Sequence, residues 1–335
     1  MSAESMPDDP TTAARVARRT LLAGAAAAVA GAWIWHELPS ASATQRATTH
    51  SRATTTARPL ATLPTPKPWL PGAGEVDPSV KLRAVQFLEA LGTWSSGGVG
   101  VSAAQHRVAG LGYDPNLVSQ ARSLLASAPA AVTRVTDAQY GGILSSSSSV
   151  LVVLEQWLRR ADGSVLHRGT TVDVRLVGAR PKWRVTELHP ANPGPRATVS
   201  AQARAVVNNH RIILPFAARA DIESGHVHNS VLSCLTTLAH DYVLNVSVVR
   251  SGHPIYVFGT SRLSDHPRGR AVDIWSVDGH PIVHPQNRAL TIAVMRRAAL
   301  SGPYQVGGPV LLSGPRASFF SDQTHQDHIH LGFST

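Results

Sequence analysis

Apolar residues recur every three or four positions in five stretches of the chain, and this spacing predicts helices. The first begins directly after Asp77-Pro78, a pair suited to capping a helix and opening its first turn. Its apolar face is formed by Val80, Ala84, Phe87, Leu88 and Leu91. The other four helices are predicted over residues 116–126, 200–208, 228–242 and 285–300.

Strand-like runs follow the second of these helices. They are Ala131–Val135, Val150–Arg159, Thr170–Val177 and Trp183–Leu188, with a hairpin turn at Ala161-Asp162-Gly163. Helices followed by a curved antiparallel sheet resemble the nuclear-transport-factor-like cone domains, and this resemblance covers residues 76–192 through the order of its elements. It implies an α+β domain. Because no chemical motif is visible there, we interpret it as a binding or spacer module.

The N-terminal residues have the composition of an export signal. Residues 1–19 end in Arg18-Arg19, an apolar stretch follows, and Ala41-Ser42-Ala43 offers small residues for cleavage. We therefore predict a cytoplasmic n-region over 1–19 and a signal peptide or membrane anchor over 20–43; the paired arginines resemble a twin-arginine signal. Both alternatives place the remainder outside the cytoplasm, secreted or in the cell envelope, and a retained segment would attach it to the membrane. Residues 44–75, rich in Thr, Ala and Pro, are predicted to form a disordered tether.

Charge and cysteine content limit the partners and the metal ligands. The formal net charge of +10 favours an anionic partner, and an anionic cell-wall polymer is one candidate. Nucleic acid is disfavoured, since no basic patch interleaved with aromatic residues accompanies the charge. Cys234 is the single cysteine of the sequence, so an intramolecular disulfide and a cysteine-based zinc cage are both excluded. Any metal must be bound by His, Asp or Glu.

A Pro/Gly-rich stretch over residues 190–195 marks a boundary, and residues 196–335 are predicted to form a second α+β domain. Its strands are expected at Leu244–Arg250, Ile255–Phe258 and Ala271–Trp275. Together with the C-terminal segment they would build a central antiparallel sheet flanked by helices. The predicted fold class is therefore α+β in both domains.

Two motifs in this second domain point to metal chemistry. Residues 264–273 read S-x-H-x-x-G-x-A-x-D, and the chain closes with H-Q-D-H-I-H over 325–330. Because residues two apart on a strand share a face, His328 and His330 are expected to project into one site. Asp273, on a neighbouring strand, and His266, on its preceding loop, could join them. Two histidines and one carboxylate form the three-ligand arrangement that catalytic zinc uses, with a fourth position left for water.

Both motifs, in this order, resemble the D-alanyl-D-alanine carboxypeptidase and dipeptidase branch of a zinc peptidase superfamily that also includes lysostaphin, murein endopeptidases and the Hedgehog N-terminal domain. The match covers roughly residues 245–335. It implies one zinc ion per chain, bound by His266, Asp273 and His330. The seven-residue step between the first two ligands is the feature that favours this branch.

The resemblance leaves the general base open between two patterns. Carboxypeptidase-like members carry an acidic residue three positions before the last ligand, which corresponds to Asp327. Murein endopeptidases instead resemble H-x-x-H-x-H, matched by His325, His328 and His330. We favour Asp327 as the base and His328 as the group that stabilises the oxyanion, with His325 as an additional catalytic candidate. Asp327 can face the site only if the last strand begins after it.

The predicted function is that of an exported zinc-dependent peptidase that hydrolyses D-amino-acid-containing peptide bonds of peptidoglycan. Substrate-binding candidates are Arg250, Arg262 and Arg268, whose guanidinium groups suit a carboxylate, and Ser264. The alternative is a catalytically silent, metal-containing binding module at the cell envelope, as in Hedgehog. The sequence leaves open which peptide bond would be cut.

Overall fold

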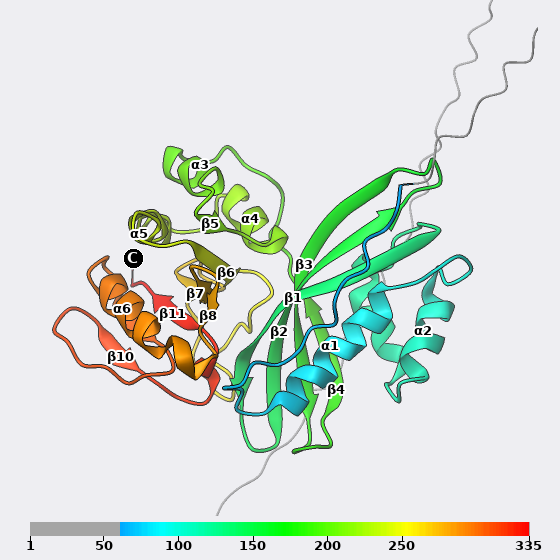
Figure 1. The fold of residues 1–335 in the computed structure, drawn as a ribbon, viewed down its shortest axis with the longest axis horizontal. Helices are drawn as coiled ribbons and strands as arrows, with labels where there is room; N and C mark the ends of the chain where they lie inside the picture. Colours follow the sequence, from blue (N-terminus) through cyan, green and yellow to red (C-terminus); the bar gives the residue numbers. More distant parts are fainter. Residues whose placement is uncertain (1–60, 335) are drawn as a thin grey trace, which may run out of the picture. The chain divides into compact units, whose positions relative to one another are not determined.

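Two β-sheets organise residues 61–334, the part of the chain that the computed structural model describes (Figure 1). The sheets come from successive halves of the chain, in which helices and mainly antiparallel strands occur together. The predicted α+β class is therefore confirmed. The predicted n-region, export segment and first part of the tether lie outside the described residues.

The first sheet has four antiparallel strands in the order β1-β2-β3-β4. Their bounds are Ala130–Ile143, Ser147–Arg159, Val165–Val177 and Arg184–Pro190. The hairpin predicted at residues 161–163 joins β2 to β3, where Gly163 has φ of 82° and Asp162 accepts the backbone N–H of Ser164. β1 extends eight residues beyond its predicted C-terminal end at Val135, and this extension brings the strand to the second sheet.

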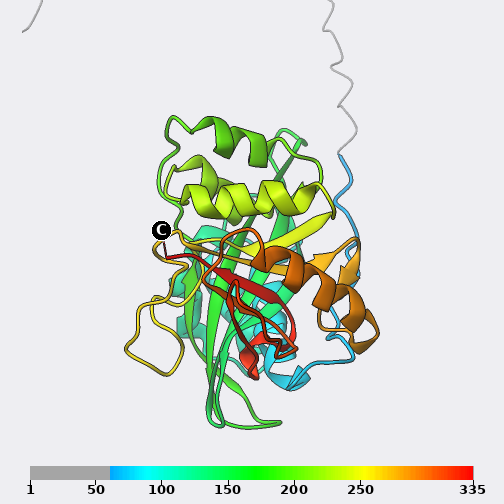
Figure 2. The ribbon, with the colours of Figure 1, turned by 90° about the vertical axis from the view of Figure 1, so that its left-hand side faces the viewer.

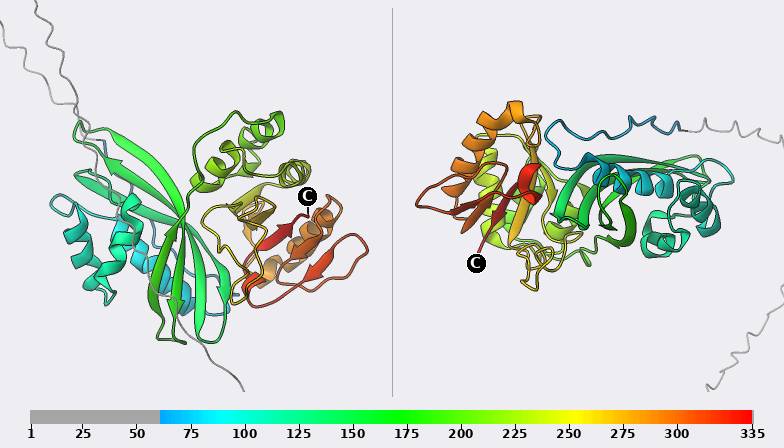
Figure 3. Two further views of the ribbon diagram at one scale, coloured as in Figure 1. Left: turned by 180° about the vertical axis from the view of Figure 1, so that it is seen from behind. Right: turned by 90° about the horizontal axis from the view of Figure 1, so that it is seen from below.

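Three helical segments cover this sheet: α1 (Pro78–Gly92), α2 (Val101–Ala109) and η1 (Pro115–Leu124). As expected, Asp77 caps α1 by accepting the backbone N–H of Ser79. α1, drawn in cyan, lies across the sheet, and its buried face joins strands β1–β4 in one hydrophobic core (Figure 3). The predicted helix over 116–126 is a 3-10 helix, and α2 was not predicted.

The second sheet has seven strands in the order β10-β9-β11-β7-β6-β5, with β8 paired to β7. Strand pairing is antiparallel from β9 through β11 and β7 to β6 but parallel at β10–β9 and β5–β6, so the sheet is mixed rather than purely antiparallel as expected. The bounds are β5 Ile212–Ile213, β6 Leu244–Val248, β7 Ala271–Val277, β8 His280–Pro281, β9 Gln305–Gly307, β10 Ser318–Phe320 and β11 Ile329–Gly332.

The strand predicted at Ile255–Phe258 is wrong. This segment is an irregular loop that makes one isolated bridge, between Tyr256 and Leu263, and it leaves Ile255 exposed. Phe258 of this loop packs on the four-stranded sheet instead of pairing within its own. A Cβ atom on Gly142 of β1 would clash with the Phe258 ring, so this close approach requires glycine.

The helices predicted over 200–208, 228–242 and 285–300 are confirmed as α3, α5 and the pair η2–α6. In Figure 2, α3, α4 and α5 are gathered together, whereas α6 lies beside strand β11. Their apolar faces and the sheet enclose a second large core, in which Cys234 is fully buried. The bounds are α3 Ala201–Val207, α4 Phe216–Glu223, α5 Asn229–Ala239, η2 Pro285–Asn287, α6 Arg288–Ala299 and η3 Thr324–Gln326.

Residues 61–75, the last part of the predicted tether, contain no helix or strand but lie against the folded body. Trp69 packs against the core of the four-stranded sheet. A Cβ atom on Gly74 would clash with the backbone carbonyl oxygen of Val283, which lies beyond β8 of the other sheet. The segment therefore touches both halves. No helix within residues 61–334 is long and apolar enough to cross a membrane.

The two cores belong to one compact unit that spans residues 57–335. We therefore expect Leu88→Ala, in the first core, and Leu235→Ala, in the second, each to lower the free energy of unfolding by about 2–5 kcal/mol, because both side chains are fully buried. Thermal unfolding followed by circular dichroism should show a single transition that either substitution shifts. Ser233→Ala, at an exposed position of α5, is the control. Two separate transitions, each moved by only one substitution, would contradict a single cooperative unit.

Candidate metal centre

Strand pairing in the second sheet brings two of the predicted ligands together. β11 runs antiparallel to β7 in a register that sets His330 directly opposite Asp273. β11 begins at Ile329, after Asp327, as the hypothesis of a site-facing Asp327 required. His266 reaches the same point from the loop before β7. Residues that are 57 and 64 positions apart in sequence therefore meet in one site.

The three side chains converge through one atom each. His330 Nδ1 lies 2.9 Å from Asp273 Oδ1, His266 Nε2 lies 3.2 Å from the same oxygen, and the two nitrogens are 3.3 Å apart. All three residues are buried. A tetrahedral ion with bonds of about 2.0–2.1 Å separates its ligand atoms by about 3.3–3.4 Å, so this triangle is close to one face of such a tetrahedron.

The loop holds His266 in the tautomer that metal binding needs. His266 Nδ1 donates to the carbonyl oxygen of Val249 at 2.9 Å, so the neutral ring presents a lone pair on Nε2. The loop turns tightly at Gly269, where φ is 68° and a Cβ atom would clash with the carbonyl oxygen of His226. Glycine is therefore required at this position of the S-x-H-x-x-G motif.

The protonation states also suit a cation. Burial would raise the pKa of Asp273, but the neighbouring His266 and His328 hold it well below its ordinary value, so the group is a carboxylate. Burial lowers the pKa of His330 to about 4 despite the contact with Asp273, so its ring is neutral. Asp273 therefore presents a negative charge and His330 a neutral ring, and a cation would complete the site.

A fourth residue, His253, also lies at this position. His253, His266 and Asp273 offer ligand atoms that are all within 4.8 Å of one another, and they form a possible metal-binding triad. The His253 ring stacks on His266 with centroids 4.0 Å apart. Its Nδ1 contacts the carbonyl oxygen of Pro254 at 2.9 Å, which leaves Nε2 available. His253 lies outside both sequence motifs, in a segment 251–254 whose Gly and Pro predict a turn, so the sequence did not indicate it as a ligand.

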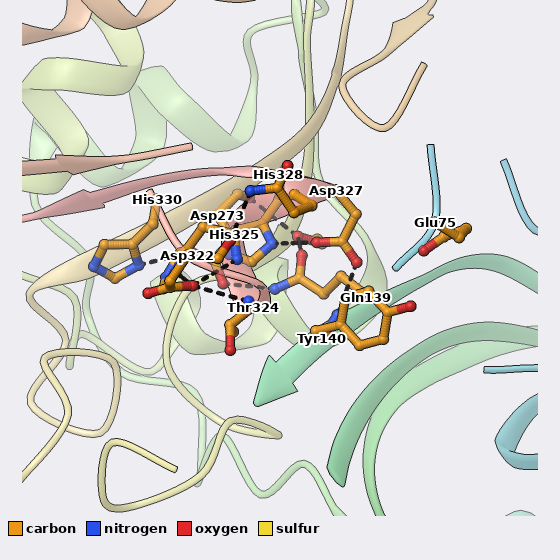
Figure 4. A network of polar contacts seen from close by, with 12 residues as sticks. Glu75, Gln139, Tyr140, Asp273, Asp322, Thr324, His325, Asp327, His328 and His330 are labelled. Carbon is orange, nitrogen blue, oxygen red and sulfur yellow. Dashed lines mark hydrogen bonds and ion pairs between the residues drawn. The ribbon is translucent and has the colours of Figure 1, made fainter. Parts of the chain in front are cut away.

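Asp327 and His328 form a buried pair beside the triangle (Figure 4). His328 Nδ1 lies 2.6 Å from Asp327 Oδ1, while its Nε2 lies 3.8 Å from Asp273 Oδ1. The other oxygen of Asp327 accepts the backbone N–H of Tyr140 and the ammonium of Lys81. Burial opposes the charged form of His328, yet Asp273 and Asp327 raise its pKa to about 9. Both oxygens of Asp327 are therefore engaged, and His328 is the member of the pair that faces the triangle.

The four-stranded sheet supplies an outer partner that no sequence motif predicted. Gln139, buried on β1, donates from Nε2 to Asp273 Oδ2 at 2.6 Å (Figure 4). Its Oε1 in turn accepts the hydroxyl of Ser247 on β6. Asp273 thereby keeps Oδ1 toward the two histidines. Such outer contacts fix ligand orientation, so this half of the chain takes part in the site.

A cavity of about 560 Å³ opens in front of the triangle. Its walls come from the C-terminal end of β1, from the loop before β7 and from the segment between β10 and β11 that contains η3. Among the predicted substrate-binding residues, Arg262 and Ser264 line it; the same is true of His325 and His328. Arg250 lies elsewhere, against Asp221 and the carbonyl oxygen of Pro193, and Arg268 pairs with Asp265.

Comparison of the chain with protein-family models, with curated proteins and with solved structures finds no match.

Metal binding should depend on His266 and Asp273, since both belong to the triangle and to the triad with His253. We expect His266→Ala and Asp273→Ala to abolish stoichiometric divalent metal, measured by elemental analysis after dialysis. His330→Ala should weaken binding by more than the roughly 10–100-fold typical of an outer partner, and His253→Ala by less. Loss of metal in His253→Ala with retention in His330→Ala would reverse the choice of third ligand.

Gln139 offers a separate test of the outer contact. Gln139→Leu removes the donor to Asp273 Oδ2 and should lower metal affinity by roughly 10–100-fold in a chelator competition. Gln202→Leu, at an exposed position of α3, is the matched control and should leave affinity unchanged. Equal affinities of Gln139→Leu and the unaltered protein would show that Asp273 needs no orientation from β1.

Proposed function

We propose that the C-terminal part of this chain, residues 196–335, is a zinc-dependent peptidase domain that hydrolyses D-amino-acid-containing peptide bonds of peptidoglycan, and that residues 76–192 form a cone-like, nuclear-transport-factor-like domain. The observation that carries the proposal is the buried triangle of His266 Nε2, Asp273 Oδ1 and His330 Nδ1, beside the Asp327–His328 pair and open to a cavity. The motif resemblance supplies the reaction class.

The donor set supports zinc as the ion. Two imidazole nitrogens and one carboxylate oxygen are ligands that zinc accepts, whereas Ca²⁺ and Mg²⁺ favour all-oxygen sites. The separations of the three atoms match those of zinc ligands, and the cavity lies beside His330. One zinc ion per chain would be held by His266, Asp273 and His330, with His253 beside them. When bound, zinc supplies a Lewis acid that lowers the pKa of a water molecule toward 7 and polarises a carbonyl group.

His328 is the residue we assign to proton transfer, with Asp327 holding its ring. Asp327 was the expected base, but both its oxygens accept hydrogen bonds, whereas His328 Nε2 faces the ligand atoms. A divalent cation next to His328 opposes a second positive charge, so its pKa would fall below the value of about 9 that it has beside the carboxylates alone. The neutral ring can then accept a proton from water through Nε2.

In the hydrolysis, the water oxygen bonds to the carbonyl carbon of the peptide and the C–N bond breaks. His328 takes the proton of the water and delivers it to the departing amine, so the products are a carboxylic acid and an amine. As an imidazolium in between, His328 also stabilises negative charge on the carbonyl oxygen, which is the role the motif analysis gave it. Asp327 compensates that positive charge.

The cavity and the export-type N-terminus support the substrate class. Arg262, exposed at the cavity wall, can pair with a peptide carboxylate, and the cavity is of the size that a short peptide segment fills. Peptidoglycan peptides would be met outside the cytoplasm, as the composition of residues 1–43 predicts. His325, at the same wall, donates from Nδ1 to Asp322 Oδ1 and can contact the same substrate.

One observation favours the second candidate, a metal-containing binding module without turnover. Asp327 accepts hydrogen bonds from His328, Tyr140 and Lys81, so this carboxylate is not free to act as the base. In that case the cavity would bind a peptide and release it unchanged.

Digestion of purified peptidoglycan, with products identified by mass spectrometry, separates the two candidates. We expect the zinc-loaded protein to release peptide fragments or free D-amino acid. His330→Ala should abolish the product, and His328→Ala should lower kcat by about 10²–10⁴-fold, the usual contribution of a general acid–base group. His210→Ala, on the surface, is the matched control. Bound zinc without any product would favour the binding module. Absence of zinc would contradict the assignment of His266, Asp273 and His330 as zinc ligands.

A further inference from the structure

Lys81 is fully buried in the first turn of α1, although an ammonium group is costly to remove from water. Its Nζ lies 2.5 Å from Asp327 Oδ2 and 2.6 Å from Glu75 Oε2. The same atom lies 4.2 Å from the centroid of the Tyr140 ring, within the range of a cation–π contact. Lys81 therefore bridges two buried carboxylates, one just before α1 and the other 246 residues away in the candidate site.

The three donors around Asp327 fix that carboxylate in position and orientation. Lys81 Nζ and the backbone N–H of Tyr140 both reach Oδ2, and the Tyr140 contact is 2.9 Å long. His328 Nδ1 occupies Oδ1. Figure 4 shows Asp327 between His328 and Tyr140, with Glu75 on the far side from the histidines. Two of the three donors come from the half of the chain that carries the four-stranded sheet.

The charge on Lys81 bears on His328 through Asp327. Burial would raise the pKa of Asp327, but the charges of Lys81 and His328 keep it below its ordinary value. Burial would likewise lower the pKa of Lys81, but Asp327 and Glu75 raise it. An ionised Asp327 accepts a hydrogen bond from His328 Nδ1–H, and this contact turns His328 Nε2 toward Asp273.

We propose that Lys81 is a positioning residue of the candidate site: it fixes Asp327 as the partner of His328 Nδ1, so that the site is complete only with the four-stranded half of the chain. The inference rests on the proposed function for its catalytic consequence, but the contact itself is independent of turnover. Lys81 touches neither the ligand atoms nor the cavity in front of them.

The contact of Glu75 with Lys81 supports the positioning role of Lys81. Asp327 alone would balance the charge of one ammonium, yet a second carboxylate lies against the same Nζ. Asp137, also buried, leaves Oδ2 without a hydrogen-bond partner nearby, and its pKa is raised to about 7 by burial. Lys81 is thus the cation around which acidic groups from both halves gather. Without it, Asp327 would lie among carboxylates that oppose its charge.

The test compares Lys81→Met, Asp327→Asn and the double variant in the purified zinc-loaded protein. We expect Lys81→Met to keep its zinc, since the ligands are untouched, and to lower kcat by about 10–100-fold with little change in KM. The double variant should be no slower than the slower single variant, because both changes act on the same Asp327–His328 contact. Unchanged kcat in Lys81→Met, or effects of the two changes that multiply, would overturn the proposal.

Three further variants separate positioning from general loss of structure. Lys182→Met makes the same change at an exposed lysine and should retain full kcat. Glu75→Gln keeps the Lys81–Asp327 pair and should retain most of the activity, whereas Lys81→Arg keeps the cation and should recover part of what Lys81→Met loses. A Lys81→Arg variant no faster than Lys81→Met, although folded by circular dichroism, would contradict a role for the charge.

An NMR measurement that does not depend on catalysis tests the positioning role of Lys81 separately from the proposed peptidase function. In protein labelled with ¹⁵N-histidine, NMR should detect the Nδ1–H of His328 hydrogen-bonded to Asp327. We expect Lys81→Met, but not Lys182→Met, to shift or broaden that signal. If the unaltered protein cleaves no peptidoglycan, the proposed function fails while this signal still tests the contact. An identical signal in Lys81→Met and the unaltered protein would overturn the positioning role.

Discussion

The register between β7 and β11, which sets Asp273 opposite His330, is the constraint on which the site depends. Because facing residues of an antiparallel pair lie close together, a shift of one residue would turn one of the two side chains to the other face of the sheet. His266 must then reach the same point from its loop, and it does so through a tight turn at Gly269. A buried carboxylate faced by two imidazoles is costly without a compensating positive charge. The geometry and the electrostatics therefore both favour a bound cation.

Asp273 is also held from outside its own sheet. Its outer oxygen is bound by Gln139, which lies at the end of β1 in the four-stranded sheet. The next residue, Tyr140, gives its backbone N–H to Asp327, and Lys81 binds the same carboxylate from α1. The half of the chain in which no chemical motif is visible is therefore part of the site. This arrangement accounts for the long extension of β1 beyond the strand expected from its apolar pattern.

Local patterns predicted most of the regular structure, because helix and strand periodicity depends on which face of each element is buried. The helix after Asp77, the helices over 200–208 and 228–242 and the hairpin at 161–163 all follow from such patterns. Failures occurred where packing between distant segments decides. Ile255–Phe258 is apolar enough for a strand but has no partner edge, since the loop packs against β1. The short β5, β8, β9 and β10 carry too few residues for a period to be detected.

The sequence by itself determined that His266, Asp273 and His330 belong to one motif set, and that the last strand can place His328 and His330 on one face. The seven-residue step from His266 to Asp273 and the two-residue step from His328 to His330 are local along the chain, and the resemblance of both motifs to one family joined them into a set. Only the tertiary structure decided that His253 joins the group, that both oxygens of Asp327 are engaged, and that Lys81 and Gln139 reach the site. Those contacts join residues separated by 20 positions in the case of His253 and Asp273, and by 134 and 246 positions in the cases of Gln139 and Lys81. No periodicity or spacing encodes such separations, because they arise from how two sheets pack against each other.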